Sequence, residues 1–481
     1  METTAHPFDT FRHRRLMGRL TAVAVACLLV LAVDNPVLAF GLQERIELAP
    51  FDGSAGPGQP DEYPRAFGAA AAVDGDVAVV GAPQCVASGP CGRAYVYVRG
   101  AREWQQAAVL ASDEVGRDTG FGAAVAISGD TIVVGARSAR HPVWGTTSGR
   151  VFVFQRPAGG WSGHPEPAAT LAFEPVGNGE RSTFGADVAV DGDLVAVGDP
   201  SGLRDDGDPY HQRNGRVYTY RRPARGWSGE TRALATLEPD DGRNAFGRSV
   251  ALDGTTLVVG ATGSGEEIGG AYVFADVQRL RGTRNEDSHL LGNGAGFGID
   301  VDVSGDTVVV GASATDVQGD PARGTAYVYQ RPTAGWASTH TAVTALVASD
   351  GRADDLFGRG VAIDGDEILV GAPERAVEGP GQAYRFRLPS GSWPYAMTED
   401  VRLEPPDGAY GFGHAVTLDG ALSVIGAPAF GQGAGSAHLY QPRPSGEHFE
   451  EQQAVDDDGS SSDGPYSYGP EQQAPSQENS G

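Results

Sequence analysis

The chain has 481 residues, including 70 glycines and 31 prolines, and its formal net charge is −26. All of its 36 basic residues are arginine, because the sequence contains no lysine. This acidity argues against nucleic acid and anionic membrane surfaces as partners, since their phosphate groups would repel the protein. The glycines and prolines predict many turns, and few segments show helical periodicity.

The N-terminus has the pattern of a secretory signal peptide. Several arginines in residues 12–19 precede an apolar run at Thr21–Val33, which is too short for a comfortable membrane span. Small residues then permit cleavage after Ala39. We therefore expect residues 1–39 to be removed, the mature protein to be secreted or held at the cell surface, and no membrane insertion afterwards. A lipid anchor at Cys27 and an uncleaved membrane anchor are the alternatives.

Two cysteines remain after this cleavage. Cys85 and Cys91 lie in the short segment "PQCVASGPCG". An oxidising compartment favours a local disulfide between them. A pair of free thiols or a metal-binding pair is the alternative, although two cysteines alone do not make a zinc site.

Seven copies of one motif follow along the chain. Each begins with Phe-Gly and reaches the last glycine of an apolar run, such as "TIVVG", 14 residues after the phenylalanine. The spacing between copies varies from 51 to 63 residues, and a constant core with variable connectors predicts a repeat fold. The copies begin at Phe67, Phe121, Phe184, Phe246, Phe297, Phe357 and Phe412.

The copy at Phe121 predicts four strands. "AAVAIS" (Ala123–Ser128) alternates weakly, and "SGD" after it is typical of a two-residue hairpin turn whose glycine needs a positive φ. "TIVVGA" (Thr131–Ala136) is a continuous β-branched run, typical of a buried strand. "GRVFVFQR" (Gly149–Arg156) alternates as a third strand, "RPAGGWSG" turns, and "AATLAFE" (Ala168–Glu174) is the fourth strand.

Four antiparallel strands repeated seven times leave edges that must be covered. Radial closure into an all-β, seven-bladed β-propeller of four-stranded antiparallel blades covers them, and a linear array is the alternative. A tryptophan precedes most fourth strands, and we expect it to pack the rim of a blade, with sugar binding as the alternative. These tryptophans are Trp104, Trp161, Trp227, Trp336 and Trp393.

The two ends of the repeat region are complementary. After "AHLYQPR" (Ala437–Arg443), the third strand of the last copy, no fourth strand led by tryptophan follows. Before the first copy, "ERIELAP" (Glu44–Pro50) resembles "ATLEPD" (Ala235–Asp240). We therefore expect the N-terminal strand to complete the seventh blade, so that one propeller occupies residues 40–443.

The last segment, residues 444–481, is acidic and rich in Ser, Gly and Gln, with few large apolar residues. This composition predicts a disordered tail. A plain solvated tail is the simplest interpretation, and a tether or spacer is the alternative.

The Phe-Gly opening and the "VVGAP"-like strand end resemble the FG-GAP repeat, as found in the N-terminal propeller of integrin α subunits, and in particular its bacterial extracellular form. "VASDGRADDLFGRGVAIDGDEILVGAPE" (Val347–Glu374) carries this pattern well, and the resemblance covers roughly Glu44–Arg443. It implies a seven-bladed propeller used for adhesion or protein recognition, with no catalysis.

The hairpin turns depart from the family pattern. In several integrin blades the first hairpin is a calcium loop of the form DxDxDGxxD, because a hard cation needs six to eight oxygen ligands. Here the turn is only "DGD" at Asp74–Asp76, Asp191–Asp193 and Asp364–Asp366, and "SGD", "DGT" or "DGA" elsewhere. Two carboxylates beside a tight turn cannot surround an ion, so we assign no cofactor and no metal ligand to these turns.

Acidic clusters also lie in the connectors, where weak calcium binding by aspartates is an alternative to ordinary turn roles. The clusters are "PDDGRN" (Pro239–Asn244), "SDGRADD" (Ser349–Asp355) and "RDDGD" (Arg204–Asp208).

One face of such a propeller would carry the long, varied connectors between second and third strands, and between fourth and first strands. Binding residues tend to lie on loops of this kind, and Trp and Tyr are common interface anchors. Segments 137–149 and 199–215 are the richest, and they predict a binding face, with ordinary loop filling as the alternative. The candidate residues are His141, Trp144, Asp205, Asp206, Tyr210 and His211.

These features predict a non-catalytic recognition or adhesion protein whose partner is an extracellular protein or a glycan. Carbohydrate binding, with Trp144 and Tyr210 as stacking platforms, is one alternative, and a hydrolase with its site on the loop-rich face is another. The sequence has no G-x-S-x-G, no HExxH and no glycine-rich phosphate loop opening a helix, and no histidine recurs with the repeat. We therefore assign no catalytic residue.

Overall fold

The computed structural model describes residues 43–50, 66–84, 92–101, 103–112, 119–140, 147–173, 182–201, 215–241, 245–262, 269–374, 379–429 and 435–442. Within these ranges the chain forms 32 strands and one 3-10 helix, η1 (Val277–Arg279). The strands belong to a unit that ends at Arg443. The predicted signal peptide and acidic tail lie outside the described residues. No helix in the described ranges is long and apolar enough to cross a membrane.

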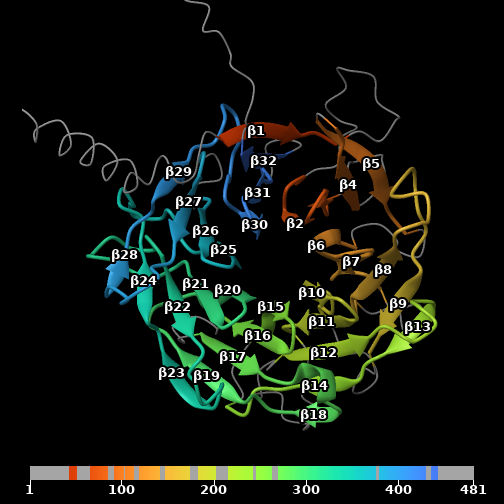
Figure 1. Ribbon diagram of the computed structural model, residues 1–481, viewed down its shortest axis with the longest axis horizontal. Coiled ribbons are helices and arrows are strands. Elements are labelled where there is room, and N and C mark those ends of the chain that lie inside the picture. Colours follow the sequence, from red (N-terminus) through yellow and green to blue (C-terminus); the bar gives the residue numbers. More distant parts are fainter. Residues whose placement is uncertain are drawn as a thin grey trace, which may run out of the picture. The chain divides into compact units, whose positions relative to one another are not determined.

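The strands form seven sheets around a common centre, with the first strand of every repeat innermost (Figure 1). We number these blades 1 to 7, starting from the repeat at Phe67. The innermost strands are β2 (Ala70–Asp74), β6 (Phe121–Ser128), β10 (Asp187–Asp191), β15 (Phe246–Asp253), β20 (Phe297–Ser304), β25 (Gly360–Asp364) and β30 (Ala415–Asp419).

Each blade continues outwards through a second and a third strand. The second strands are β3 (Val77–Ala82), β7 (Thr131–Ala136), β11 (Leu194–Asp199), β16 (Thr256–Ala261), β21 (Thr307–Ala312), β26 (Glu367–Ala372) and β31 (Leu422–Ala427). The third strands are β4 (Arg93–Arg99), β8 (Arg150–Gln155), β12 (Arg216–Arg221), β17 (Gly270–Phe274), β22 (Thr325–Gln330), β27 (Gln382–Arg387) and β32 (Ser436–Pro442).

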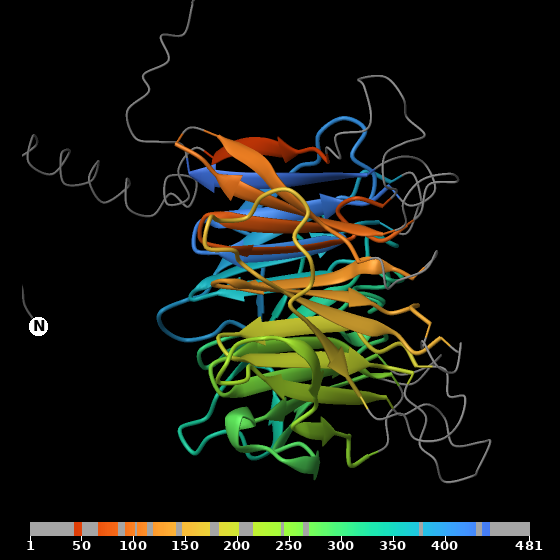
Figure 2. The same ribbon diagram turned by 90° about the vertical axis from the view of Figure 1, so that its right-hand side faces the viewer.

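The fourth position comes from the same repeat in blades 1 to 6 and from the N-terminus in blade 7. In the first six blades it is β5 (Trp104–Leu110), β9 (Ala169–Ala172), β14 (Ala235–Leu237), β19 (Ser288–Leu291), β24 (Thr344–Leu346) and β29 (Val401–Leu403). Within each blade these successive strands pair antiparallel, as the sequence predicts. Figure 2 shows the ring edge-on, with the strands running between two faces.

The predicted ring closure is confirmed. Strand β1 (Gln43–Leu48) pairs antiparallel with β32, from Gln43 opposite Pro442 to Leu48 opposite Ala437. The seventh blade therefore joins the two ends of the repeat region, which removes the exposed edge that β32 would otherwise present.

Several blades have a fifth strand, which the sequence did not predict. The segment around the tryptophan turn leaves its own blade and pairs parallel with the outer strand of the preceding blade. These outermost strands are β13 (Gly229–Arg232), β18 (Gly282–Arg284), β23 (Ser338–Thr341) and β28 (Ala396–Met397). In blade 1 a single bridge between Ala108 and Gly163 takes this place. Each such segment covers an outer sheet edge and fastens two blades together.

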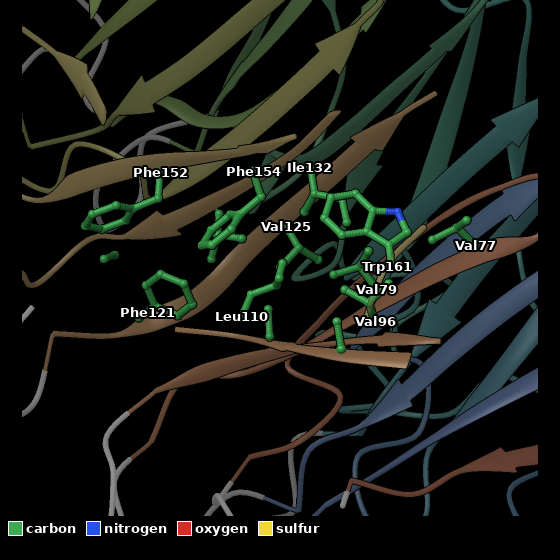
Figure 3. Packing of buried hydrophobic residues seen from close by; sticks show 14 of the residues in the cluster. Val77, Val79, Val96, Leu110, Phe121, Val125, Ile132, Phe152, Phe154 and Trp161 are labelled. Carbon is green, nitrogen blue, oxygen red and sulfur yellow. The ribbon is translucent and has the colours of Figure 1, made fainter. Parts of the chain in front are cut away.

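The hydrophobic core consists of layers between adjacent blades. Strand β7 shows the reason, because Ile132 and Val134 point into the layer shared with blade 1, whereas Val133 points into the layer shared with blade 3. Side chains of a strand alternate between the two faces of its sheet, and both faces are buried here. This arrangement explains the continuous apolar run in every second strand. Figure 3 shows the layer between blades 1 and 2.

The phenylalanine of Phe-Gly fills the space between blades. Phe121 is 0% exposed and lies between Leu110 of blade 1 and the aromatic rings of its own third strand (Figure 3). Its ring centroid lies 5.6 Å from that of Phe152 and 6.3 Å from that of Phe154. Phe246 and Phe357 pack against two rings of their own third strands in the same way.

The tryptophans pack between blades, as expected. Trp161 lies in the layer between blades 1 and 2 and is 5% exposed (Figure 3). Trp104, Trp227 and Trp336 are also buried, and Trp393 is half-buried. Blade 4 has no tryptophan at this point, and Val277 of η1 enters the corresponding layer instead.

We predict that closure by β1 supports the whole domain. Leu48 is 2% exposed in the layer between blades 7 and 1, so Leu48→Ala should lower the free energy of unfolding by about 2–5 kcal/mol.

Deleting residues 43–48 should lower the melting temperature of the entire β-structure in one transition. Urea and thermal unfolding followed by circular dichroism measure both effects. The exposed neighbour provides the control, because Glu47→Ala should change stability by less than about 0.5 kcal/mol. A deletion variant that melts like the wild type would contradict the closure.

Candidate functional site

The inner hairpin turns are connected to one another around the ring. In each turn the residue before the glycine is Asp or Ser, and its side-chain oxygen accepts a hydrogen bond from the turn glycine of the next blade. Gly129 N–H donates to Asp74 Oδ2 at 2.5 Å, and Gly192 N–H donates to Ser128 Oγ at 3.0 Å. The remaining pairs are Gly254 with Asp191, Gly305 with Asp253, Gly365 with Ser304, Gly420 with Asp364, and Gly75 with Asp419.

These contacts define what the turn carboxylates do. The first acidic residue of a turn links two blades, and in several turns the second pairs with an arginine at the end of the third strand. Asp130 and Arg156 are 3.8 Å apart, and Asp306 and Arg331 are 3.4 Å apart. Among the described residues, no group of three or more His, Cys, Asp or Glu side chains is placed to hold a metal ion. The turns are structural links between blades.

Two connector clusters also have structural partners. In "SDGRADD", Asp350 accepts a hydrogen bond from the Tyr384 hydroxyl at 3.0 Å and lies 2.8 Å from the Arg402 guanidinium. In "PDDGRN", the Tyr272 hydroxyl donates to Asp241 at 2.9 Å. These contacts support the turn interpretation of both clusters. The third cluster, Arg204–Asp208, lies outside the described residues.

The predicted binding residues fall on connectors that the structure describes only at their ends. His141 and Trp144 lie between β7 and β8, and the other four candidates, Asp205, Asp206, Tyr210 and His211, lie between β11 and β12. All six are outside the described residues, as are Cys85 and Cys91. The ends of β7 and β11 and the beginnings of β8 and β12 lie on the face opposite the hairpin turns, because each strand pair is antiparallel. We call this the connector face.

A cluster of charged residues lies where the central channel opens on the connector face. The channel mouth is a cavity of about 200 Å³, lined mainly by the two residues that follow each Phe-Gly. Blades 1 and 2 contribute small side chains there, such as Ala69 and Ala123. The charged and polar lining consists of Arg137, Asp187, Arg248, Ser249, Asp300, Arg359 and His414.

The two carboxylates of the mouth are held by neighbouring blades. Asp187 Oδ2 accepts a hydrogen bond from Val250 N–H at 2.7 Å. Asp300 accepts from the Ser249 hydroxyl at 3.0 Å and from Val361 N–H at 2.8 Å. Both acids therefore tie a first strand to the next one, in the same manner as the turn aspartates.

Burial and like charges shift the titration of this cluster. Burial, and then the Asp300 carboxyl, raise the pKa of Asp187 to about 7. Burial raises the pKa of Asp300 as well. Burial, and then Arg248, lower the pKa of Arg359 to about 10. Burial and the neighbouring Arg359 lower the pKa of His414 to about 3, so that this imidazole is neutral at physiological pH. The mouth therefore places three arginines beside two acids whose pKa values are raised.

This cluster was not predicted from the sequence, although the repeats carry a signal for it. The two positions after Phe-Gly read "AA" in the first two copies, then "AD", "RS", "ID", "RG" and "HA". Arg137 stands where three other copies have the proline of "GAP". Residues that differ between copies at the same position of a regular repeat, where the position faces the axis, indicate a set of side chains that meet at the centre of the ring.

The repeats match a known family. Residues 104–154, 232–274, 292–329 and 340–386 match the family model described as the FG-GAP repeat. These four segments are FG-GAP repeats. The structure adds blades for the copies at Phe67, Phe184 and Phe412, which the four matches do not include. Together, the four matches and the seven blades fit an integrin α-like FG-GAP propeller.

Among solved structures, the chain is similar to the WD40 domain of coronin from Toxoplasma gondii. The two are 10% identical, and the alignment covers 85% of this chain and 89% of the coronin domain with a TM-score of 0.49. No curated protein matches the chain.

We predict that the turn aspartates stabilise the ring as hydrogen-bond acceptors. Asp253→Ala removes the acceptor for Gly305 N–H and should lower the free energy of unfolding by about 1 kcal/mol. Asp253→Ser should retain most of the stability, because Ser128 and Ser304 perform the same role in two other blades. Urea unfolding compares the variants. Asp193→Ala, on the far side of a turn glycine, is the control and should have little effect. Equal stability of the Ala and Ser variants would contradict the assignment.

We also predict a specific pH dependence from Asp187. Its pKa rises from 3.8 to about 7 on folding, so between these values the folded state holds a proton that the unfolded state has lost. The contribution of this residue to stability therefore falls as pH rises through that window. Asp187→Asn retains an oxygen acceptor and removes the titration. Between pH 5 and pH 8 the wild type should lose more stability than the variant in urea unfolding, and parallel pH curves would contradict the shift.

Proposed function

We propose that this FG-GAP propeller is a secreted or cell-surface protein that recognises or adheres to a protein partner and has no catalytic role. The observation that carries the proposal is the difference between its two faces. One face consists of two-residue turns tied to each other around the ring. The opposite face carries connectors of variable length, such as those between β7 and β8 and between β11 and β12.

A ring of this kind suits recognition, because a rigid scaffold reduces the entropy lost when loops bind a partner. The interblade layers and hydrogen bonds hold the strand ends, and thus the starting points of the connectors, in fixed positions. The connectors that bear Trp144 and Tyr210 begin from neighbouring blades 2 and 3. Aromatic side chains of this type are common anchors of protein interfaces. The apolar segment at Thr21–Val33 supports secretion.

The glycan alternative uses the same residues. Trp144 and Tyr210 would stack on sugar rings, and the connector face would then recognise a carbohydrate. A hydrolase with its site on that face is the less favoured alternative, since it needs a convergent nucleophile and base for which neither sequence nor described geometry supplies a candidate.

We predict that binding depends on the connector face. The mature protein, residues 40–481, is applied in parallel to an array of extracellular protein domains and to a glycan array. The paired variant Trp144→Ala/Tyr210→Ala should lose at least about 2 kcal/mol of affinity for any protein bound by the wild type. Asp130→Asn on the hairpin face is the matched control and should bind normally. Signals restricted to glycans would favour the carbohydrate alternative. If the paired variant binds a protein partner as tightly as the wild type does, the connector face is not the binding face.

A further inference from the structure

The mouth of the central channel is cationic in a protein that is otherwise strongly acidic. Arg137 of blade 2, Arg248 of blade 4 and Arg359 of blade 6 reach it from alternating positions around the ring. The formal charge of the whole chain is −26, so a local excess of fixed positive charge needs a specific explanation. Exposed arginines on such a surface normally pair with acids, as Arg156 does with Asp130.

The arginines of the mouth lack such partners. Among the described residues, none of the three forms a salt bridge, and the one polar contact of Arg359 is with His414, at 3.4 Å between Nη2 and Nε2. The two nearby acids are already occupied, because their oxygens accept backbone N–H groups and the Ser249 hydroxyl from neighbouring blades. The positive side chains therefore line the cavity without a salt bridge among the described residues, and the two acids attract them only at longer range.

Their electrostatics agree with this geometry. Burial, and then the nearby Arg248, lower the pKa of both Arg137 and Arg359, whereas Asp300 acts in the opposite direction on Arg359. Repulsion among three like charges lowers the stability of the folded protein unless a bound anion offsets it. Guanidinium groups are also the side chains best suited to bind planar carboxylates and phosphate-like oxyanions through paired hydrogen bonds.

The size of the cavity limits the ligand. A volume of about 200 Å³ lies below that of pockets for drug-sized ligands, about 300–1,000 Å³. The first strands of blades 1 and 2 contribute only small side chains such as alanine, whereas Arg248 and Arg359 come from blades 4 and 6 and Arg137 from the connector after β7. This space accommodates a single small oxyanion group rather than a nucleotide or an extended chain.

We propose that the channel mouth is an oxyanion-binding site, in which Arg137, Arg248 and Arg359 hold one carboxylate, sulfate or phosphate group on the axis of the propeller. Such a group comes either from a free inorganic anion or from an organic acid, including an acidic side chain of a partner. The proposal does not depend on what the predicted aromatic residues of the connectors recognise.

Isothermal titration calorimetry on the full mature chain tests this site. Sodium sulfate and sodium succinate are titrated separately at pH 6, with sodium chloride keeping the ionic strength constant, because surface charge effects vary with salt. Sulfate is chosen because it does not titrate near neutrality, whereas Asp187 does. At least one of the two anions should bind with one site per chain, and its affinity should weaken at pH 8, where the Asp187 carboxyl is ionised beside Asp300.

Arginine variants decide whether the binding belongs to the mouth. Arg248→Gln and Arg359→Gln should each weaken the affinity about tenfold or more, because each removes charge-assisted hydrogen bonds to the anion. Arg156→Gln, whose arginine pairs with Asp130 on the hairpin face, is the matched control and should leave the affinity unchanged. Binding of sulfate alone would identify an inorganic-type oxyanion site, and binding of succinate alone would identify a carboxylate site.

Stability measurements keep the test independent of folding defects. Without an added oxyanion, Arg248→Gln and Arg359→Gln should melt at the same temperature as the wild type or higher, since like-charge repulsion is relieved. Sulfate also stabilises proteins generally, so only the difference between wild type and variant is informative. If neither anion binds, or if Arg156→Gln weakens binding as much as the mouth variants do, the proposal is wrong. Arg137→Gln, at an exposed position, replaces any variant that fails to fold.

Discussion

Adjacent blades approach each other backbone to backbone, and this contact governs the rest of the structure. The glycine that ends each apolar run packs against the Phe-Gly glycine of the next blade. A Cβ on Gly81 would overlap the carbonyl oxygen of Gly122, and the same relation holds between Gly135 and Gly185. Gly122 also adopts a φ of +85°, which side-chain-bearing residues rarely occupy. The constant 14-residue distance keeps both glycines at the same level in every blade.

This close approach has consequences at both ends of the strands. It brings the hairpin turns near enough for the Asp or Ser of one turn to reach the glycine N–H of the next, and it places the phenylalanine in a closed layer. The connectors are free of these constraints, and their lengths differ accordingly. A uniform face and a variable face are thus two results of the same packing, and the variable face is where recognition can change without loss of the ring.

The channel mouth combines these two properties. Most of its residues stand at the beginning of the rigid first strands, and Arg137 enters from the connector after β7. The residues differ from blade to blade, from alanine in blades 1 and 2 to arginine in blades 4 and 6. The carboxylates of Asp187 and Asp300 act as links between blades, whereas the arginines point into the cavity without acidic partners among the described residues. Positive side chains that form no salt bridge and stand on a rigid ring suit an anion site, because little reorganisation precedes binding.

Local patterns in the sequence were sufficient for the four main strands of a blade, the hairpin turns, the number of blades and the closure by residues 44–50. Alternation, β-branched runs and glycine turns act over a few residues, so one repeat could be interpreted without its neighbours. The parallel pairing of β13 with β9 was not predictable, because a turn sequence does not indicate which sheet edge it reaches. The hydrogen bond between Gly129 and Asp74 and the meeting of Arg137, Arg248 and Arg359 were equally inaccessible. These residues are far apart in the chain. They become neighbours only because the closed ring brings its first strands, and the connector end that bears Arg137, to one axis.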